Sequence, residues 1–169
     1  MEEAIINFAT YEGSTEYLGM AEWTLPNLER QTVDVTGAGI SGTFSAPVLG
    51  HFSAMSATAN WRTPNEKQAK LMTNEPHTID LRAAIERRNP TTGAVETVPV
   101  KHIMVVRPKS LNMGKVAPAS TADASMEFSV SYFATYINGE KITEIDIFNM
   151  IAIVNGVDEL AATRAALGK

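Results

Sequence analysis

The sequence predicts a mainly β protein of the α+β class, and three observations lead to that prediction. Apolar and polar residues alternate along much of the chain, which is typical of strands with one buried face. Turns rich in Asn, Gly and Pro separate the alternating stretches. Two short segments break the alternation with helical spacing. The 169 residues are 44% hydrophobic and 20% charged, so we expect a single domain over 1–169.

Strands are predicted wherever the alternation holds. The clearest stretch runs from Met126 to Tyr136, where even-numbered positions are apolar and most odd-numbered positions are polar. All the even-numbered side chains of this stretch are therefore expected on one buried face. Further strands are expected at 17–25, 28–36, 55–61, 77–85 and 96–106.

Turn chemistry connects these strands. Asn138-Gly139 predicts a tight hairpin, because both residues tolerate a positive φ. Asn89-Pro90-Thr91-Thr92-Gly93 predicts a longer hairpin loop, and Pro26-Asn27 separates the first two strands. The segment 108–125 shows no periodicity and is rich in Pro, Ser, Ala, Lys and Gly, so we expect a long loop there.

Two helices are predicted. Thr63-Pro64-Asn65-Glu66 has the pattern of a capping box with proline at the first helical position, and the helix would run to about Met72. Gly168 stands where a C-terminal cap belongs. The apolar stripe of that second, C-terminal helix would consist of Val157, Leu160, Ala161 and Leu167.

Composition excludes several classes of protein. The chain has no cysteine, which excludes disulfides and thiolate metal sites. A net charge of −5 argues against a dedicated nucleic-acid binder. Met1-Glu2-Glu3 lacks the basic start of a secretory signal, and no stretch approaches the ~20 apolar residues that span a bilayer. We expect synthesis in the host cytoplasm as a soluble chain without a stable membrane anchor.

The motifs favour neither a cofactor nor a catalytic site. Gly37–Gly42 spells G-x-G-x-x-G, but Thr43–Pro47 is a poor helix start, so a glycine-rich turn is favoured over a dinucleotide site. Glu140, Glu144 and Asp146 cluster near the last hairpin without the signs of a pocket, and a solvated or inter-subunit face is favoured. We expect no enzyme activity, cofactor or metal.

The histidines are expected to be ordinary sheet residues. Their spacing is not that of zinc ligands, although His77 and His102 would meet if their strands paired that way. Partly exposed histidines on a sheet are the favoured interpretation. The three histidines are His51, His77 and His102.

The order of motifs resembles one known family. The C-terminal series is Glu144-Ile145-Asp146, Asn149-Met150-Ile151 and Val154-Asn155-Gly156-Val157-Asp158, followed by a short helix. The N-terminal series is Gly19-Met20, Thr24-Leu25-Pro26-x-Leu28 and the glycine-rich Gly37–Gly42. Together they resemble the major tail tube proteins of contractile-tailed phages over nearly the whole chain.

The resemblance implies an antiparallel β-barrel or sandwich with one flanking helix and a short C-terminal helix. Six subunits would close a ring in which neighbouring strands form one continuous inner barrel, and the rings would stack into a tube inside a contractile sheath. The implied partners are further copies of the chain, the tail sheath protein, a baseplate or tube initiator, and a tape-measure protein in the lumen. DNA would pass only as non-specific cargo. The product would be a virion tail or an extracellular phage-tail-like particle.

Contact surfaces are assigned on this basis. The loop 108–125 is expected to be mobile in the free subunit and ordered by the neighbouring ring. Small polar side chains suit a wide aqueous lumen, and an acidic wall would repel DNA. The inter-ring or inter-subunit contact residues expected are Ile5, Ile6, Phe8, Lys109, Leu111, Met113, Lys115, Val157 and Leu160. The lumen residues expected are Ser56, Thr58, Asn60, Ser129 and Ser131.

Three alternatives remain open at this stage. The tube could belong to a DNA-free contractile injection particle such as a bacteriocin, because the ring would be the same object. A monomeric ligand-binding β-barrel would close on itself around a concave apolar pocket. An enzyme is least favoured, since the chain shows no nucleophile, base and orienting group that would converge.

Overall fold

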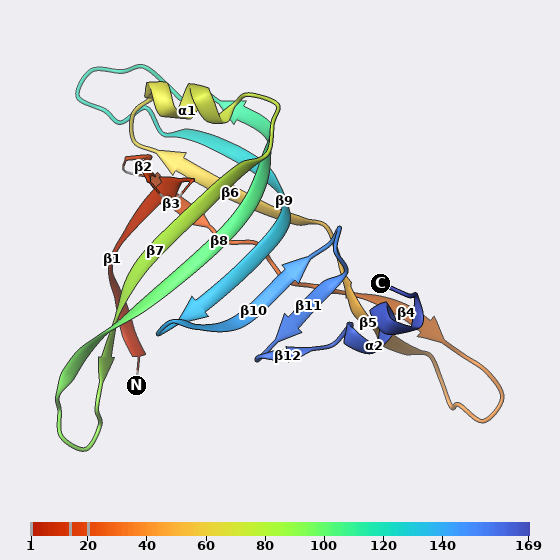
Figure 1. Ribbon diagram of the computed structural model, residues 1–169. Helices are drawn as coiled ribbons and strands as arrows, with labels where there is room; N and C mark the ends of the chain where they lie inside the picture. Colours follow the sequence, from red (N-terminus) through yellow and green to blue (C-terminus); the bar gives the residue numbers. More distant parts are fainter. Residues whose placement is uncertain (1, 14, 20) are drawn as a thin grey trace.

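A computed structural model describes residues 2–13, 15–19 and 21–169. Met20, which belongs to the family resemblance, lies outside the described residues. Over the described residues the chain is mostly antiparallel β structure, with a ten-stranded sheet, a separate two-stranded sheet and two short helices. The predicted mainly β fold with a flanking helix and a C-terminal helix is confirmed (Figure 1).

The elements follow one another along the chain in a fixed order. The N-terminal half contains β1 (Glu2–Glu12), β2 (Glu16–Tyr17), β3 (Ala21–Thr24), β4 (Arg30–Val35), β5 (Phe44–Phe52), β6 (Met55–Trp61), α1 (Glu66–Leu71) and β7 (His77–Arg88). The C-terminal half contains β8 (Val95–Asn112), β9 (Ala124–Ile137), β10 (Glu140–Asp146), β11 (Ile151–Val154), β12 (Val157–Asp158) and α2 (Ala161–Ala166).

The large sheet forks at β9. Its main path runs β12-β11-β10-β9-β8-β7-β1-β2, while β6 also pairs with β9 and β3 pairs with β6. The first half of β9, 124–130, pairs with β6, and the second half, 132–137, pairs with β10. One branch, which contains β3, β6, the first half of β9, β8, β7, β1 and β2, curves around a common core (Figure 1). Its edges are β3 at one end and, at the other, β1 with the short β2 paired to its last two residues.

A β-bulge at Ser131 explains the fork. Opposite β8 the register shifts so that Val106 pairs with Val130 while Val105 pairs with Tyr132, which leaves Ser131 as the extra residue. The extra residue reverses the alternation, so beyond the bulge Phe133 is the buried core residue. The expectation of one uninterrupted face from Met126 to Tyr136 was therefore wrong.

The core lies inside the curved branch. It is built mainly from alternate residues of β6, β7, β8 and β9, and its largest fully buried side chains are Trp61 and Phe128, each at most 2% exposed. α1 closes one end through the fully buried Leu71 (Figure 1). The residues of the core cluster are Leu18, Met55, Ala57, Ala59, Trp61, Leu71, Ile79, Met104, Val106, Met126, Phe128, Val130, Phe133 and Ile145.

Helix α1 begins two residues later than the predicted capping box. Its N-cap is Asn65, whose side-chain oxygen accepts a 2.8 Å hydrogen bond from the backbone N–H of Gln68. Thr63 and Asn65, which are two positions apart, are both good N-caps, and local sequence does not decide between them. The C-cap Met72 agrees with the predicted end.

Several strands differ from their predicted limits. The expected strand 17–25 is interrupted, because β2 ends at Tyr17 and β3 begins at Ala21. The strands β1 and β5 were not predicted. The expected loop 108–125 was too long at both ends: β8 continues to Asn112 and β9 begins at Ala124, so the irregular segment is 113–123.

The predicted turns are confirmed. Asn138 and Gly139, with φ of 52° and 83°, connect β9 to β10, and the loop 89–94 connects β7 to β8. Gly37–Gly42 forms the turn between β4 and β5, and a strand rather than a helix follows it, as a glycine-rich turn requires.

The predicted C-terminal helix was too long. Val157 belongs to β12, and α2 begins only at Ala161. Gly168 has a φ of 72° and donates its backbone N–H to the Ala165 carbonyl, so it caps α2 as expected. Among the described residues, no helix is long and apolar enough to cross a bilayer.

Candidate functional site

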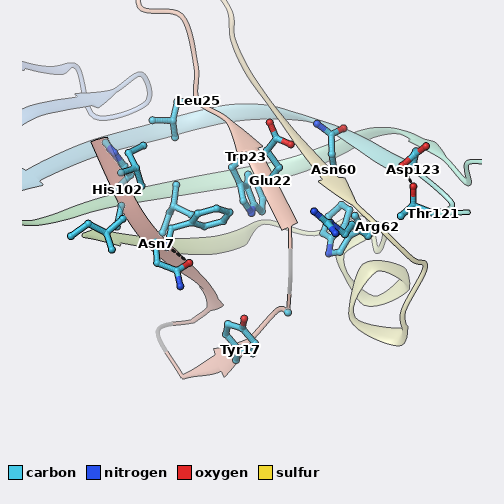
Figure 2. A pocket seen from close by; sticks show the side chains of 17 residues that line it. Asn7, Tyr17, Glu22, Trp23, Leu25, Asn60, Arg62, His102, Thr121 and Asp123 are labelled. Atoms are coloured by element: carbon cyan, nitrogen blue, oxygen red, sulfur yellow. Dashed lines mark hydrogen bonds between the residues drawn. The ribbon is translucent and has the colours of Figure 1, made fainter. Parts of the chain in front are cut away.

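A groove lies between the two free edges of the curved sheet. β1 pairs with β7 on one side, and on its other side, among the described residues, only Tyr11 and Glu12 are paired with β2. Over the described residues β3 pairs only with β6. The groove that opens beside these edges has a volume of about 1340 Å³ (Figure 2). Its apolar lining includes Ile5, Ile6, Phe8, Trp23, Leu25, Leu81 and Ala83.

The β1 wall of the groove exposes large apolar side chains to solvent. Ile5 is 65% exposed, Ile6 54% and Phe8 39%. These three predicted contact residues therefore lie together on one surface. A second β-bulge after Ile5 places Ile6 outside the regular alternation of β1. A contiguous apolar surface of this kind marks a site of interaction.

Aromatic side chains form the floor of the groove. Trp23 stacks on Phe128 with ring centroids 5.6 Å apart and meets Trp61 edge-on at 6.4 Å. The indole N–H groups of both tryptophans are shielded from solvent and have no acceptor within the described chain. Polar groups lie around the groove, with Arg62, Thr121 and Asp123 on the side of the loop 113–123 (Figure 2).

The β4–β5 hairpin, residues 30–52, is a second exposed surface, which we call the arm. It projects away from the body of the sheet on the side opposite β1 (Figure 1). Val33 pairs with Ala46 and Val35 with Phe44, so these four side chains share one face of the arm.

This face of the arm is apolar and open to solvent. Val33 is 56% exposed, Val35 40% and Phe44 61%. The opposite face carries the cross-strand pair Asp34 and Ser45. A two-stranded hairpin is marginally stable unless its apolar face packs against something, so the arm has the form of a contact element.

The base of the arm is fixed to the C-terminal segment. Arg30 donates two 2.8 Å hydrogen bonds to the Glu159 carboxylate and lies over the Phe52 ring. These bonds hold the pKa of Glu159 below its usual value and raise that of Arg30. Next to them Gly50, with a φ of 67°, lies against Leu160.

Leu160 was expected at a contact between subunits, but it is only 6% exposed and packs within its own chain against Gly50. Val157 is 64% exposed and remains available for contacts. Arg164 hydrogen-bonds the Asp158 carboxylate and lowers its pKa, which fixes α2 to the preceding strand.

The expected lumen residues lie largely on one face. Ser56 pairs with Ser129, and Thr58 and Asn60 follow on the same face of β6, opposite its buried residues. Ser131 differs because it forms the bulge, and its hydroxyl donates to the Val105 carbonyl at 3.4 Å.

A row of mostly charged side chains runs across four neighbouring strands of the same sheet. Arg82, Lys101, Tyr136 and Lys141 are successive cross-strand neighbours on β7, β8, β9 and β10. Carboxylates accompany this row, and Asp80 accepts a 2.7 Å hydrogen bond from Arg82. The face therefore combines charges of both signs and is not a uniformly acidic wall.

Glu144 shows how one of these carboxylates is held. It is 9% exposed and accepts hydrogen bonds from the Tyr132 hydroxyl at 2.7 Å and from Lys141 at 2.9 Å. Burial and the hydrogen bond to Glu144 together raise the pKa of Tyr132. Of the three carboxylates that cluster near the last hairpin in the sequence, Glu144 is thus held by internal bonding of the sheet.

The predicted loop contacts divide between two environments. Leu111 and Lys109 belong to β8: Leu111 packs against the core cluster, and Lys109 forms a 2.8 Å ion pair with Glu127. Met113, which is 63% exposed, and Lys115 belong to the irregular segment. The expectation that all four lie on a loop was therefore wrong for the first two, because strand pairing extends to Asn112.

The histidines do not form a site. Register places His77 opposite Val106 and His102 opposite Leu81, so the two do not meet. His77 is buried rather than partly exposed, and its Nδ1 lies 2.7 Å from Glu12. Burial lowers the pKa of His102. Among the described residues no cluster of three or more His, Asp or Glu side chains has a geometry that could hold a metal.

The first strand of the arm and its glycine-rich turn were predicted, but its second strand, β5, was missed although a signal for it was present. From 31 to 50 the chain carries a single charge, Asp34, and its apolar residues alternate on both sides of the glycine-rich turn. Such a pattern predicts an amphipathic hairpin. The groove had no comparable signal, because its walls come from distant segments.

Known proteins resemble this chain in sequence and fold. The family model of phage tail tube protein FII matches residues 2–168. The tail tube protein of Escherichia phage P2 is 30% identical over 157 residues, covering 90% of this chain and 89% of the P2 protein.

Two solved structures share the fold, both from the extracellular contractile injection system PVC in its extended state. The sheath/tube terminator has a TM-score of 0.55 at 11% identity and covers 79% of this chain and 96% of its own. The sheath–tube complex contains a chain with a TM-score of 0.53 at 14% identity, covering 79% of this chain and 90% of that one. The family match over nearly the whole length places this chain in the phage tail tube protein FII family.

Proposed function

We propose that the chain is the structural subunit of a contractile tail's inner tube, with six copies forming a ring and the rings stacking into a hollow tube. The observation that carries this function is the 30% identity with the phage P2 tail tube protein over 90% of the chain. The free edges of β1 and β3 support assembly, because unpaired strand edges favour pairing with another copy.

The partners follow from this role. The sheath protein surrounds the tube, a baseplate component starts it, a tape-measure protein occupies its lumen, and DNA passes through without specific contacts. The sheet face that carries Arg82, Lys101 and Lys141 supports weak DNA binding, because Arg82 and Lys101 both lie near Asp80 rather than forming an unopposed basic patch. No catalytic step is part of the function.

The likeness to the PVC chains shows that components of an extracellular contractile injection system share this fold. The relative with substantial sequence identity is a phage protein, and we therefore place this chain in a phage-type tail. Mass spectrometry of particles from the producing host would test the assignment: copurifying capsid proteins support it, and tubes with sheath but no capsid contradict it.

Negative-stain electron microscopy with light scattering of the concentrated protein tests the tube function. We expect rings or hollow rods of uniform width. A protein that stays monomeric even with baseplate components present would contradict the proposal and favour a self-contained binding barrel.

A further inference from the structure

We propose that the apolar face of the arm of one copy packs into the groove between β1 and β3 of a second copy. The inference rests on the proposed tube function, which makes a second copy the partner, and it names the surfaces that meet. Val35 and Phe44 of one copy would thus contact the β1 wall of the groove, near Phe8, in another copy.

The two surfaces match in chemistry. The arm presents Val33, Val35 and Phe44, each at least 40% exposed, and has one charged residue between 31 and 50. The groove presents Ile5 and Phe8 over a tryptophan floor. Burying both faces removes apolar surface from water at roughly 25 cal/mol per Å².

The two surfaces also match in shape. The arm is a two-stranded ribbon, and the groove is an open trough beside which the β1 and β3 edges have no further strand partner among the described residues. A ribbon that enters the trough brings a free strand edge of its own, so backbone pairing can accompany the apolar packing.

Only a second copy can bring the two surfaces together. Within one chain the arm extends away from the body on the side opposite β1 (Figure 1). The bonds from Arg30 to Glu159 and the close packing of Gly50 on Leu160 fix the base of the arm in that direction.

A contact of this kind can be repeated from one copy of the chain to the next. A donor surface that fits a different acceptor surface on the same chain makes a head-to-tail contact, which generates closed rings or open filaments. The arm–groove contact therefore has the symmetry that a ring or a stack of rings needs, whereas a contact of each arm with its own equivalent would stop at a dimer.

Disulfide cross-linking tests the contact on a chain that has no native cysteine. Phe44→Cys and Phe8→Cys proteins, one carrying a mass tag, are mixed under assembly conditions and mildly oxidised. We expect several-fold more mixed dimer than from Ser45→Cys with Phe8→Cys, since Ser45 lies on the opposite face of β5. Equal yields from the two mixtures would overturn the proposal. Ile5→Cys replaces Phe8→Cys if the latter does not fold.

A charge substitution provides the second readout. Phe44→Asp is expected to abolish the association measured by light scattering, whereas Ser45→Asp is expected to leave association unchanged. Because the arm is exposed, both variants should unfold at the same urea midpoint. Association that survives Phe44→Asp would also overturn the proposal. Microscopy of the same samples separates the two claims: tubes without the cross-link contradict only the arm–groove contact, and the cross-link without tubes contradicts only the tube.

Discussion

Arg30 and Glu159 are 129 residues apart in the chain, yet two 2.8 Å hydrogen bonds join the guanidinium to the carboxylate. The pair connects the base of the arm to the segment that precedes α2. Both side chains are about a quarter exposed, with 32% for Arg30 and 21% for Glu159, so the bond operates at the surface of the body. Its function is to fix the direction of the arm rather than to stabilise the core.

The first prediction concerns pH and the arm. The folded state lowers the pKa of Glu159, so the bond's contribution is present above the carboxyl's ordinary pKa and is lost as the pH falls through the lowered one. Limited proteolysis should therefore cut the arm faster at acid pH. Glu159→Gln should show fast cutting already at neutral pH. Glu96→Gln, in the exposed pair with Arg87, is the control and should behave like the parent protein.

The second prediction concerns the close packing at Gly50. A Cβ at this position would lie 2.3 Å from Leu160 Cδ2, and the φ of 67° already disfavours other residues. Gly50→Ala should lower the free energy of unfolding by about 1–3 kcal/mol in urea denaturation. Gly37→Ala is the control, since nothing lies within 4 Å of its added carbon. Equal stability of the two variants would show that the segment around Leu160 moves freely.

The third prediction concerns the irregular segment between β8 and β9. The backbone N–H of Lys115 donates to the Ala122 carbonyl at 2.8 Å, so the ends of 116–121 are already close together. Replacing 116–121 by Gly-Gly should leave a folded subunit by circular dichroism. The replacement removes the exposed surface of the segment, including the fully exposed Val116, and we therefore expect ring stacking to fail. Rods of normal length from this variant would mean that the segment does not contribute to stacking.

The fourth prediction concerns the lumen. Ser129 is exposed on β9 opposite Ser56, on the face assigned to the lumen. Ser129→Cys provides a single thiol for a small gold cluster. In assembled tubes the label should appear along the axis in electron micrographs. Gold along the outer wall would assign this face to the sheath side.

Much of the sheet was predictable because its signals are local. The strands 55–61 and 77–85 and the Asn138-Gly139 turn follow from alternation and turn chemistry in neighbouring residues. The Ser131 bulge was not predictable, because an inserted residue that is itself small and polar does not interrupt the visible pattern. One residue thus changed the face to which Phe133 belongs.

The candidate site was predictable only in part. Ile5, Ile6 and Phe8 were selected because apolar residues near a terminus need cover, and the structure places them together on the groove wall. Leu160 was selected as part of the expected C-terminal helix, but it packs within its own chain against Gly50, 110 residues earlier. Such long-range packing leaves no trace in local spacing.

Cryo-electron microscopy of the assembled protein tests the central claim most directly. We predict a hollow tube with six-fold symmetry, in which the free edge of β1 meets a neighbouring subunit and the face with Ser56 and Ser129 lines the channel. A map showing solid rods, or subunits whose β1 and β3 edges both face solvent, would contradict it.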